Sequence, residues 1–279
     1  DNLEIIVVDN ASDFNPLEEI KREYPNVKVV LSDTNLGFAG GNNLGIEASS
    51  GEYLFFLNND TVLTEDIINP MVNWMKLNPQ IGILSPRLNY FDDPDLIQYA
   101  GFTEISSLSG RNQIITQPVD TKAPYATAYP HGAAMLMSRN TIEKVGKMPE
   151  DYFLYYEELD WANRVKDAGF EVFVDPRFAV YHKESVSVGN HSPLKTFFHT
   201  RNRLLFMRRN SSLVEFDIFL MYFFLVAMPK AVLQFIVKGQ LLHLGTYLRA
   251  LWLFRLPQYK ADLEDVPHPI SSNVLTPVS

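Results

Sequence analysis

Residues 5–10 read Ile5-Ile6-Val7-Val8-Asp9-Asn10, an apolar, β-branched run that ends in two polar residues. A continuous run of this kind is typical of a strand covered on both faces, as in α/β sheets. A second apolar run, Tyr53–Leu57, ends in Asn58-Asn59-Asp60. Helix-like segments separate these runs, and strands that alternate with helices predict a parallel sheet with right-handed crossovers. We therefore expect an α/β fold with a mostly parallel central sheet flanked by helices.

The polar ends of these strands are the first indication of a binding site. In open parallel sheets, ligands bind outside the carboxyl ends of the strands, where Asp9 and Asp60 both fall. A carboxylate at position 60 suits a hard divalent cation, Mg²⁺ or Mn²⁺, and one at position 9 suits a ribose or a base. Aspartate is also common in turns because it hydrogen-bonds the local backbone, so each residue taken singly has a local explanation as well.

Residues 35–45 form a glycine-rich stretch, Asn35-Leu36-Gly37-Phe38-Ala39-Gly40-Gly41-Asn42-Asn43-Leu44-Gly45. The stretch contains neither a P-loop nor a dinucleotide-binding fingerprint. Its glycines fit either a close approach of the backbone to a ligand or a tight turn.

An acidic and aromatic cluster, Tyr155-Tyr156-Glu157-Glu158-Leu159-Asp160-Trp161, marks the start of a predicted helix that Gly169 closes. Its carboxylates can simply favour the positive end of the helix dipole. Alternatively, crowding and apolar neighbours raise the pKa of one carboxyl group, which produces a general base for a hydroxyl proton. His182, at the end of a later predicted strand, is either structural or a ligand of a metal or phosphate.

Between these motifs the pattern is less regular. From Asn89 to Tyr129 we expect a long loop region or hairpin over the site, a usual place for binding specificity. An apolar strand is expected over Gly132–Met137, followed by a helix from Ser138, a suitable N-cap, to Val145.

The composition limits the kinds of molecule that the protein can bind. The chain has 279 residues and a net charge of −9, which argues against a nucleic-acid partner. A single nucleotide is still compatible, because a divalent cation reconciles a diphosphate with an acidic site. There are no cysteines, so disulfides and thiolate metal sites are excluded.

The composition changes after His182. Residues 196–209 are basic, and Ile218–Met228 is an uncharged run. This run is shorter than the about 20 residues that span a bilayer, and Pro229-Lys230 interrupts it. The favoured interpretation is an interfacial or re-entrant helical hairpin, and the alternative is a buried helical pair that packs on the main domain. We expect a main domain over 1–210, a membrane-proximal helical segment over 211–258 and a disordered tail over 259–279.

Taken in order along the chain, these segments resemble the family-2 inverting glycosyltransferases of the GT-A fold, especially the bacterial rhamnosyltransferase-like branch. The resemblance covers residues 3–210. It rests on Val7–Ser12, Asn35–Asn42, Phe56–Asp60, His131–Ala133, Phe153–Asp160, and His182 followed by Ser185 and Ser187. The family normally has one more strand and a helix before Leu3–Asp9, so the resemblance suggests that the sequence is a fragment.

The resemblance implies a role for each matched residue. Asp60 looks like the last position of the family's Asp-x-Asp motif, which ligates the metal on the sugar diphosphate, and Asn58 looks like the first. Glu158 aligns with the catalytic base, with Glu157 as the alternative, since the family more often has Asp there. His182 resembles a late histidine near the metal. The other implied contacts are to the donor, at Asp9, Asn10, Asn35, Gly37, Gly40, Asn42 and Asn59, and to the acceptor, at His131, Gly132, Asp160 and Trp161.

The function implied by the resemblance is transfer of a hexosyl or rhamnosyl group from a nucleotide-sugar donor, with Mg²⁺ or Mn²⁺. The acceptor is a hydroxyl group of a glycan or lipid-linked molecule in cell-surface polysaccharide assembly, at the cytoplasmic face of the membrane. The competing interpretations are a nucleotide-sugar-binding or scaffolding module that has lost turnover, and a sugar nucleotidylyltransferase. The sequence gives no indication of an oligomeric state.

Overall fold

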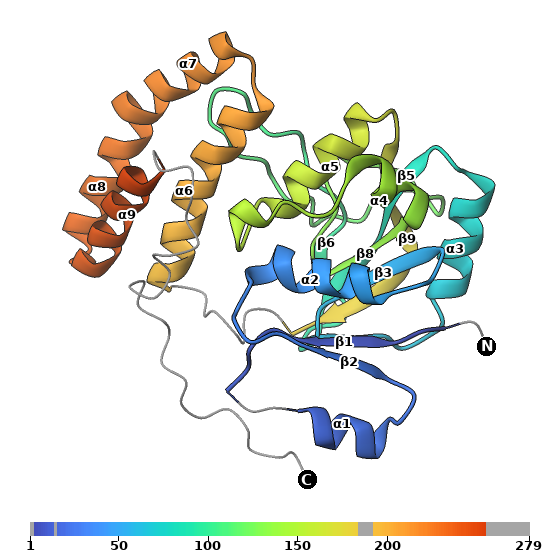
Figure 1. The fold of residues 1–279 in the computed structure, drawn as a ribbon. Coiled ribbons are helices and arrows are strands. Elements are labelled where there is room, and N and C mark those ends of the chain that lie inside the picture. The colour runs from blue at the N-terminus through green and yellow to red at the C-terminus, as the bar shows by residue number, and fades with distance from the viewer. Residues whose placement is uncertain (1–2, 14–15, 184–191, 255–279) are drawn as a thin grey trace. The chain divides into compact units, whose positions relative to one another are not determined.

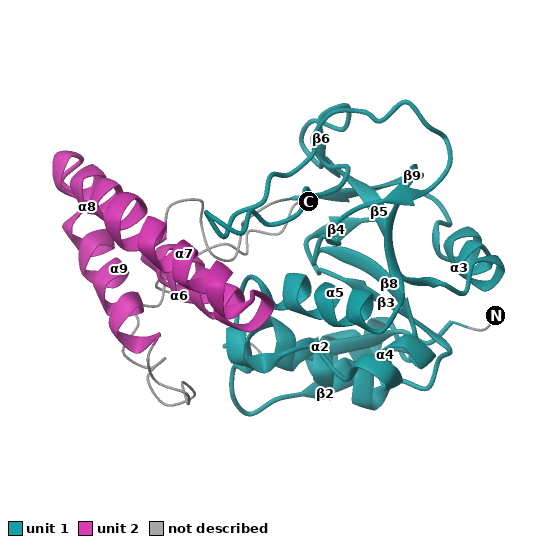
Figure 2. Cartoon of the chain, turned by 90° about the horizontal axis from the view of Figure 1, so that it is seen from above, with its two compact units in different colours: residues 1–184 teal, residues 185–279 magenta. Residues whose placement is uncertain are grey.

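The structure, a computed structural model, describes residues 3–13, 16–183 and 192–254. The chain divides into two compact units, residues 1–184 and residues 185–279 (Figure 2). The sequence predicted a boundary at residue 210, and the tail predicted over 259–279 lies outside the described residues. The helix that ends at residue 210 falls in the second unit, where it packs along the last helix of the described residues.

The first unit combines strands and helices as an α/β protein does. In chain order its elements are β1 (Ile6–Asp9), α1 (Leu17–Glu23), β2 (Lys28–Leu31), α2 (Gly37–Ala48), β3 (Tyr53–Leu57), β4 (Thr61–Val62), α3 (Ile68–Leu77), β5 (Ile81–Tyr90), β6 (Ile97–Tyr99), β7 (Tyr125–Ala126), β8 (Ala134–Ser138), α4 (Arg139–Val145), the 3₁₀-helix η1 (Glu150–Tyr152), α5 (Glu157–Asp167) and β9 (Glu171–His182). Ser138 is the N-cap of α4, and its side chain accepts a hydrogen bond from the Thr141 N–H (3.0 Å), which confirms the predicted cap.

The strands form two sheets. β1 and β2 pair in parallel, and α2 packs against both (Figure 1). The larger sheet has the order β3-β8-β5-β9-β4, with β6 beside β5 and β7 beside β9. β8 runs antiparallel to β3 and β5, whereas β5 and β9 are parallel. The expected α/β class is confirmed, while the strand directions are mixed rather than mostly parallel. An apolar run encodes the burial of a strand and not its direction.

The core of the first unit lies between α3 and the larger sheet. Met71 and Met75 of α3 pack with Leu84 and Leu88 of β5, and all four are at most 2% exposed. Burial of each side chain of this size stabilises the folded state by about 1.5–3 kcal/mol relative to leaving the side chain exposed. The strands that end next to Asp60 and in His182, β3 and β9, are therefore part of a packed core.

The second unit is helical. It contains α6 (Pro193–Asn210), α7 (Leu213–Tyr222), a π-helical segment η2 (Phe223–Ala227), α8 (Met228–Val237) and α9 (Leu241–Leu253). α9 packs against both α6 and α8. Two of the arginines that the sequence suggested as a basic face, Arg201 and Arg203, are buried, and the Arg203 guanidinium lies 5.1 Å from the centre of the Phe223 ring.

Helices α7 and α8 join through the π-helical segment into one continuous helix, Leu213–Val237. By length and composition its 25 residues suffice to cross a membrane, which corrects the expectation of an interrupted, shorter run. Proline cannot donate a hydrogen bond to the carbonyl four residues earlier. Because the π-helical turn directly precedes Met228-Pro229, the hydrogen-bond pattern changes there and the helix continues past the proline.

Candidate functional site

Asp60 and His182 meet where β4 pairs with the end of β9. Thr61 of β4 lies opposite His182, which places the preceding Asp60 beside the histidine ring. His182 Nε2 is 3.2 Å from Asp60 Oδ1, and His182 Nδ1 is 2.8 Å from Gln98 Oε1 on β6. Both His182 and Gln98 are buried. The histidine ring is thus held from one side and faces a carboxylate on the other.

The surroundings of Asp60 favour the ionised form of its carboxyl group. The contact with His182 is the largest cause that holds the pKa of the Asp60 carboxyl group below its usual value, and partial burial opposes this shift. Apart from the His182 contact, the buried Oδ1 atom has no hydrogen-bond partner among the described residues. An ionised oxygen of this kind beside an imidazole nitrogen fits a hard divalent cation.

His131 lies beside His182, with the ring centres 5.9 Å apart. Burial, followed by the neighbouring His182, lowers the pKa of His131 to about 3, so its ring is neutral at physiological pH. His131 Nδ1 accepts a hydrogen bond from the Ala133 N–H at 3.1 Å. The proton of the neutral ring is therefore on Nε2, which makes His131 a hydrogen-bond donor at this place.

Gly132 connects His131 with the acidic cluster. A Cβ atom added at Gly132 would lie 3.9 Å from Cδ of Glu158, so the Glu158 carboxyl group lies against the backbone of residue 132. Consecutive contacts run from Asp60 through His182, His131 and Gly132 to Glu158. The first unit therefore brings the two acidic side chains into one region from segments almost 100 residues apart in the sequence.

The two glutamates at the start of α5 both bind protons more tightly than usual. Burial raises the pKa of Glu158 to about 7. Burial, followed by the charge of Glu158, raises the pKa of Glu157 well above its usual value. A carboxyl group with a pKa near neutrality both accepts and releases a proton readily, which is the property required of a general base. The pKa of Glu158 lies near neutrality, as a general base requires. The side chain of Glu157 is almost completely buried, with 1% exposed.

The turn before α5 is strained. Phe153, Tyr155 and Tyr156 have φ angles of 64°, 69° and 79°, in the left-handed region that residues other than glycine rarely adopt. The carbonyl oxygen of Phe153 accepts a hydrogen bond from the N–H of Phe38 in α2 (2.7 Å). A Cβ atom at Gly37 would lie 2.2 Å from that oxygen, so the close approach requires glycine. Strain of this kind persists only where the surroundings impose it, and it is common at functional sites.

Asn10 joins the end of β1 to the start of α2. Its Nδ2 atom donates to Gly37 O (2.9 Å) and Asn35 Oδ1 (3.2 Å), and its Oδ1 accepts from the Leu36 N–H (2.9 Å). Asn35 Oδ1 also accepts from the Gly37 N–H (2.9 Å). Two of the predicted donor-binding segments are therefore in direct contact.

The other residues predicted to bind a donor make mostly local contacts. Asp9 Oδ1 accepts a hydrogen bond from the backbone N–H three residues later (3.3 Å), and Asn42 donates to the carbonyl four residues earlier (2.9 Å). Gly40 is buried in α2, where a Cβ atom would lie 2.4 Å from a leucine side chain. Asn58 is partly buried at the end of β3, and Asn59 is exposed.

Two residues predicted to contact an acceptor face the interior instead. Trp161 is fully buried, and its indole N–H donates to Gly146 O (2.8 Å). Asp160 is 4% exposed, with Oδ1 3.7 Å from Arg164 Nε. An amphipathic helix must bury one face, and both residues fall on that face of α5. Both side chains are thus buried in this structure, and their contact with an acceptor stays a prediction.

Two residues with evident positioning roles carried no signal in the sequence. Gln98, which holds His182, falls within the segment that appeared irregular. Asn43 is buried in α2, where it donates to Met148 O (2.9 Å) and accepts from the Met148 N–H (3.0 Å). A polar residue in an apolar segment is the only signal that could have indicated either one.

Comparison with known proteins identifies the family and the fold of the chain. Residues 1–146 match the family described as "Glycosyl transferase family 2". The dTDP-rhamnosyl transferase RfbF of Shigella flexneri is 24% identical over 220 residues, which cover 75% of this chain and 72% of the relative. The N-acetylglucosaminyl-diphospho-decaprenol L-rhamnosyltransferase of Mycobacterium tuberculosis (strain H37Rv) is 25% identical over 230 residues, covering 73% and 74% of the two chains.

Among solved structures, "GalNAc-T7 with UDP, GalNAc and Mn2+" superposes with a TM-score of 0.56 at 16% identity. The match covers 81% of this chain, which spans 50% of the length of that structure. At this level of identity the likeness shows the fold alone, and that fold is the GT-A glycosyltransferase fold.

Proposed function

This chain belongs to glycosyl transferase family 2, and we infer that it transfers a sugar from a nucleoside diphosphate to an acceptor hydroxyl group with inversion at the anomeric carbon. The observation that best supports this proposal is the series of contacts that links Asp60, with its buried ionised oxygen, to Glu158, whose pKa is about 7. Asp60 suits a cation that would bind the leaving diphosphate, and Glu158 suits the attacking alcohol.

In the proposed mechanism, Glu158 acts as the base. The acceptor oxygen attacks the anomeric carbon on the face opposite the diphosphate while its proton passes to Glu158. The bond between the anomeric carbon and the phosphate oxygen breaks, and both of its electrons leave with the nucleoside diphosphate. Neutral His131 would donate a hydrogen bond from Nε2 within the same region. Positioned donors of this type stabilise developing negative charge without reorganisation.

We propose that Asp60 and His182 hold a divalent cation, Mg²⁺ or Mn²⁺. No cluster of three or more acidic, histidine or cysteine ligands occurs within the described residues. Such cations need few protein ligands when substrate phosphates and water complete the coordination, so two side chains fit this role. When bound, the cation supplies neutralisation of the charge that develops on the diphosphate.

Gln98 provides a test of the cation site that does not depend on activity. The Gln98 contact fixes the His182 ring, and loss of such an orienting partner typically weakens metal binding by about 10–100-fold. We expect Gln98→Leu to weaken Mn²⁺ binding to this degree in the presence of a nucleoside diphosphate, as measured by electron paramagnetic resonance. Gln98→Glu retains an acceptor for His182 Nδ1 and should keep most of the affinity. Equal Mn²⁺ affinity in Gln98→Leu and the wild type would contradict the proposed site.

The names of the relatives support a deoxyhexose donor. Both enzymes described above are named as rhamnosyltransferases, and the first is named for a dTDP-linked donor. We propose a thymidine diphosphate sugar as the donor of this chain. A thermal-shift screen of nucleoside diphosphates with and without Mn²⁺ tests this, because a ligand at 100 times its Kd stabilises the protein by about 2.7 kcal/mol. Stabilisation by guanosine diphosphate alone would reject the proposed base.

We propose that the second unit lies on the cytoplasmic surface of a membrane, where it would approach a lipid-linked acceptor. Its exposed apolar side chains are Leu213, Val214, Ile218, Met221, Phe224, Leu225, Val226, Leu233, Ile236, Val237, Leu241, Leu242, Leu248 and Trp252. The charged residues nearby favour an interfacial position over a spanning one. α9, which packs against α8, carries Arg249, and α6, which packs against α9, has two arginines in its buried face. Arginine at the bilayer centre is costly.

Disruption of this apolar surface should release the protein from vesicles. Met221 and Leu225 lie one helical turn apart and are 63% and 72% exposed. The double substitution Met221→Glu and Leu225→Glu is expected to lower partitioning to phosphatidylglycerol vesicles at least about 10-fold, since each buried side chain contributes about 1.5–3 kcal/mol. Leu77→Glu, at an 80% exposed position on α3 of the first unit, is the matched control. Equal sedimentation of both variants with vesicles would refute the membrane contact.

A further inference from the structure

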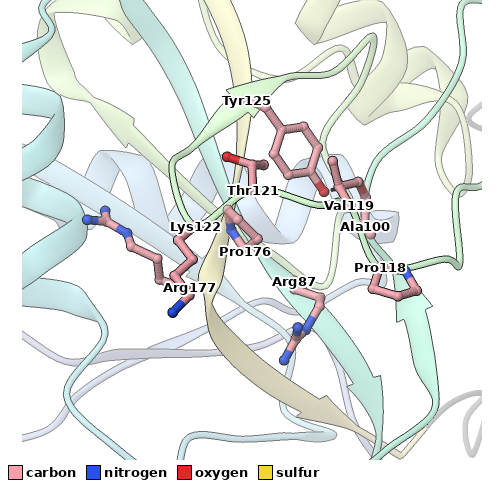
Figure 3. Close-up of a pocket in the computed structure, with 9 residues that line it drawn as sticks. All are labelled: Arg87, Ala100, Pro118, Val119, Thr121, Lys122, Tyr125, Pro176 and Arg177. Atoms are coloured by element: carbon pink, nitrogen blue, oxygen red, sulfur yellow. Dashed lines mark hydrogen bonds between the residues drawn. The ribbon is translucent and has the colours of Figure 1, made fainter.

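A cavity lies in the first unit, where strands of the larger sheet meet the loop that precedes β7. Its volume is about 470 Å³, within the range of about 300–1,000 Å³ that is typical of small-molecule sites. Arg87 of β5 and Tyr125 of β7 line it, together with the loop that contains Val119 and Lys122 (Figure 3). On β5, Arg87 is three residues before Tyr90, which pairs with His182. This spacing corresponds to about 10 Å along the strand, so the cavity is separate from the Asp60 region.

Cationic side chains surround this cavity although the chain as a whole carries a charge of −9. The three cations are Arg87, Lys122 and Arg177. Arg177 is neutralised locally, because its guanidinium forms two hydrogen bonds with the buried carboxylate of Asp175 (2.8 and 2.6 Å). The other two have no acidic partner among the described residues.

Arg87 is oriented by a neutral group. Its Nε atom donates to Asn89 Oδ1 at 3.0 Å, which fixes the guanidinium without cancelling its charge. Leu88 between them is fully buried in the core, so Arg87 and Asn89 point to the opposite face of β5. The terminal nitrogens of a fixed guanidinium present a planar fork that matches a carboxylate or phosphate group.

From this arrangement we propose that the cavity binds an organic anion with a phosphate or carboxylate group, and that this anion is a sugar, a choice that rests on the proposed function. Arg87 binds the anionic group and Lys122 adds a second positive charge. The cavity, at about 470 Å³, has room for a whole small molecule and not only for its anionic group. The apolar side chains of Val119, Pro118 and Pro176 form the rest of the wall, as in sites that bind the body of a small molecule.

The test is a titration of the whole chain with glucuronate, glucose 1-phosphate and uncharged glucose in the presence of EDTA, followed by heteronuclear NMR. We expect one or both anionic sugars, but not glucose, to shift resonances of residues that line the cavity. Arg87→Gln should weaken this binding at least 10-fold, and Lys122→Gln should weaken it less. Arg22→Gln, an exposed arginine of α1, is the matched control and should change nothing. The sugar that binds more tightly distinguishes a carboxylate from a phosphate ligand.

Two further outcomes separate this proposal from the transferase site. Unchanged Mn²⁺-dependent binding of a nucleoside diphosphate by Arg87→Gln, together with its weakened binding of the anionic sugar, supports a cavity that is independent of the proposed donor site. Absence of binding by both anionic sugars, or equal binding by Arg87→Gln and the wild type, overturns the proposal. Either of these results would leave the proposed sugar transfer unaffected.

Discussion

Glu158→Gln is expected to lower kcat by about 10²–10⁴-fold while the affinity for the nucleotide-sugar donor stays unchanged. Glutamine has nearly the size of glutamate, so it fills the same space against Gly132, but it cannot take the acceptor's proton. The donor is held in the proposal by Asp60 and the α2 segment, which this substitution does not alter. Steady-state kinetics measures the first quantity, and thermal stabilisation by the donor measures the second.

The pH dependence of the wild type provides an independent readout of the same group. The base must be deprotonated to accept a proton, and burial raises the pKa of Glu158 to about 7. The rate should therefore rise with pH and reach half of its plateau near pH 7, whereas an unshifted glutamate would place this midpoint near 4.3. Glu157→Gln is the matched control. If it abolishes turnover while Glu158→Gln remains active, Glu157 is the base.

The parts of the fold that depend on local chemistry could be predicted from the sequence. The apolar run that ends in Asp9 forms β1, and the apolar run that precedes Asn58-Asn59-Asp60 forms β3. Ser138 caps α4. These features follow from residue patterns over a few positions. The direction of β8 could not be predicted in this way, because antiparallel pairing with both β3 and β5 depends on where the chain returns.

The residues of the candidate site also fall into those that could be predicted from the sequence and those that could not. Asp60, Glu158 and His182 carry chemistry that marks them in the sequence, and ordered motifs made the family recognisable. The burial of Trp161 could not be predicted, because an aromatic residue beside carboxylates looks the same in the sequence whether its helix presents it to a ligand or to the core. Gln98 was missed because its value comes entirely from a contact with a histidine 84 residues away. Positioning residues of this type become visible only once the strands are paired.

Asp60→Asn is expected to weaken Mn²⁺-dependent binding of the nucleoside diphosphate by more than about 100-fold. This exceeds the loss that is typical when a residue outside the direct ligands is changed, since here a direct ligand is removed. The substitution keeps the shape of the side chain next to His182 but removes the negative charge that is now buried there. Calorimetric titration with the nucleoside diphosphate, in Mn²⁺ and then in EDTA, measures the effect.

The comparison of the two titrations distinguishes the cation site from general damage to the fold. In EDTA the wild type should bind the nucleoside diphosphate weakly, because nothing then offsets repulsion between the diphosphate and Asp60. Asparagine removes that repulsion, so the variant should bind at least as well as the wild type without metal, although it loses the gain that Mn²⁺ provides. A misfolded variant would lose binding under both conditions. If Mn²⁺ improved binding by the same factor in both proteins, Asp60 would not be a metal ligand, and the phosphates would have to be held elsewhere in the first unit.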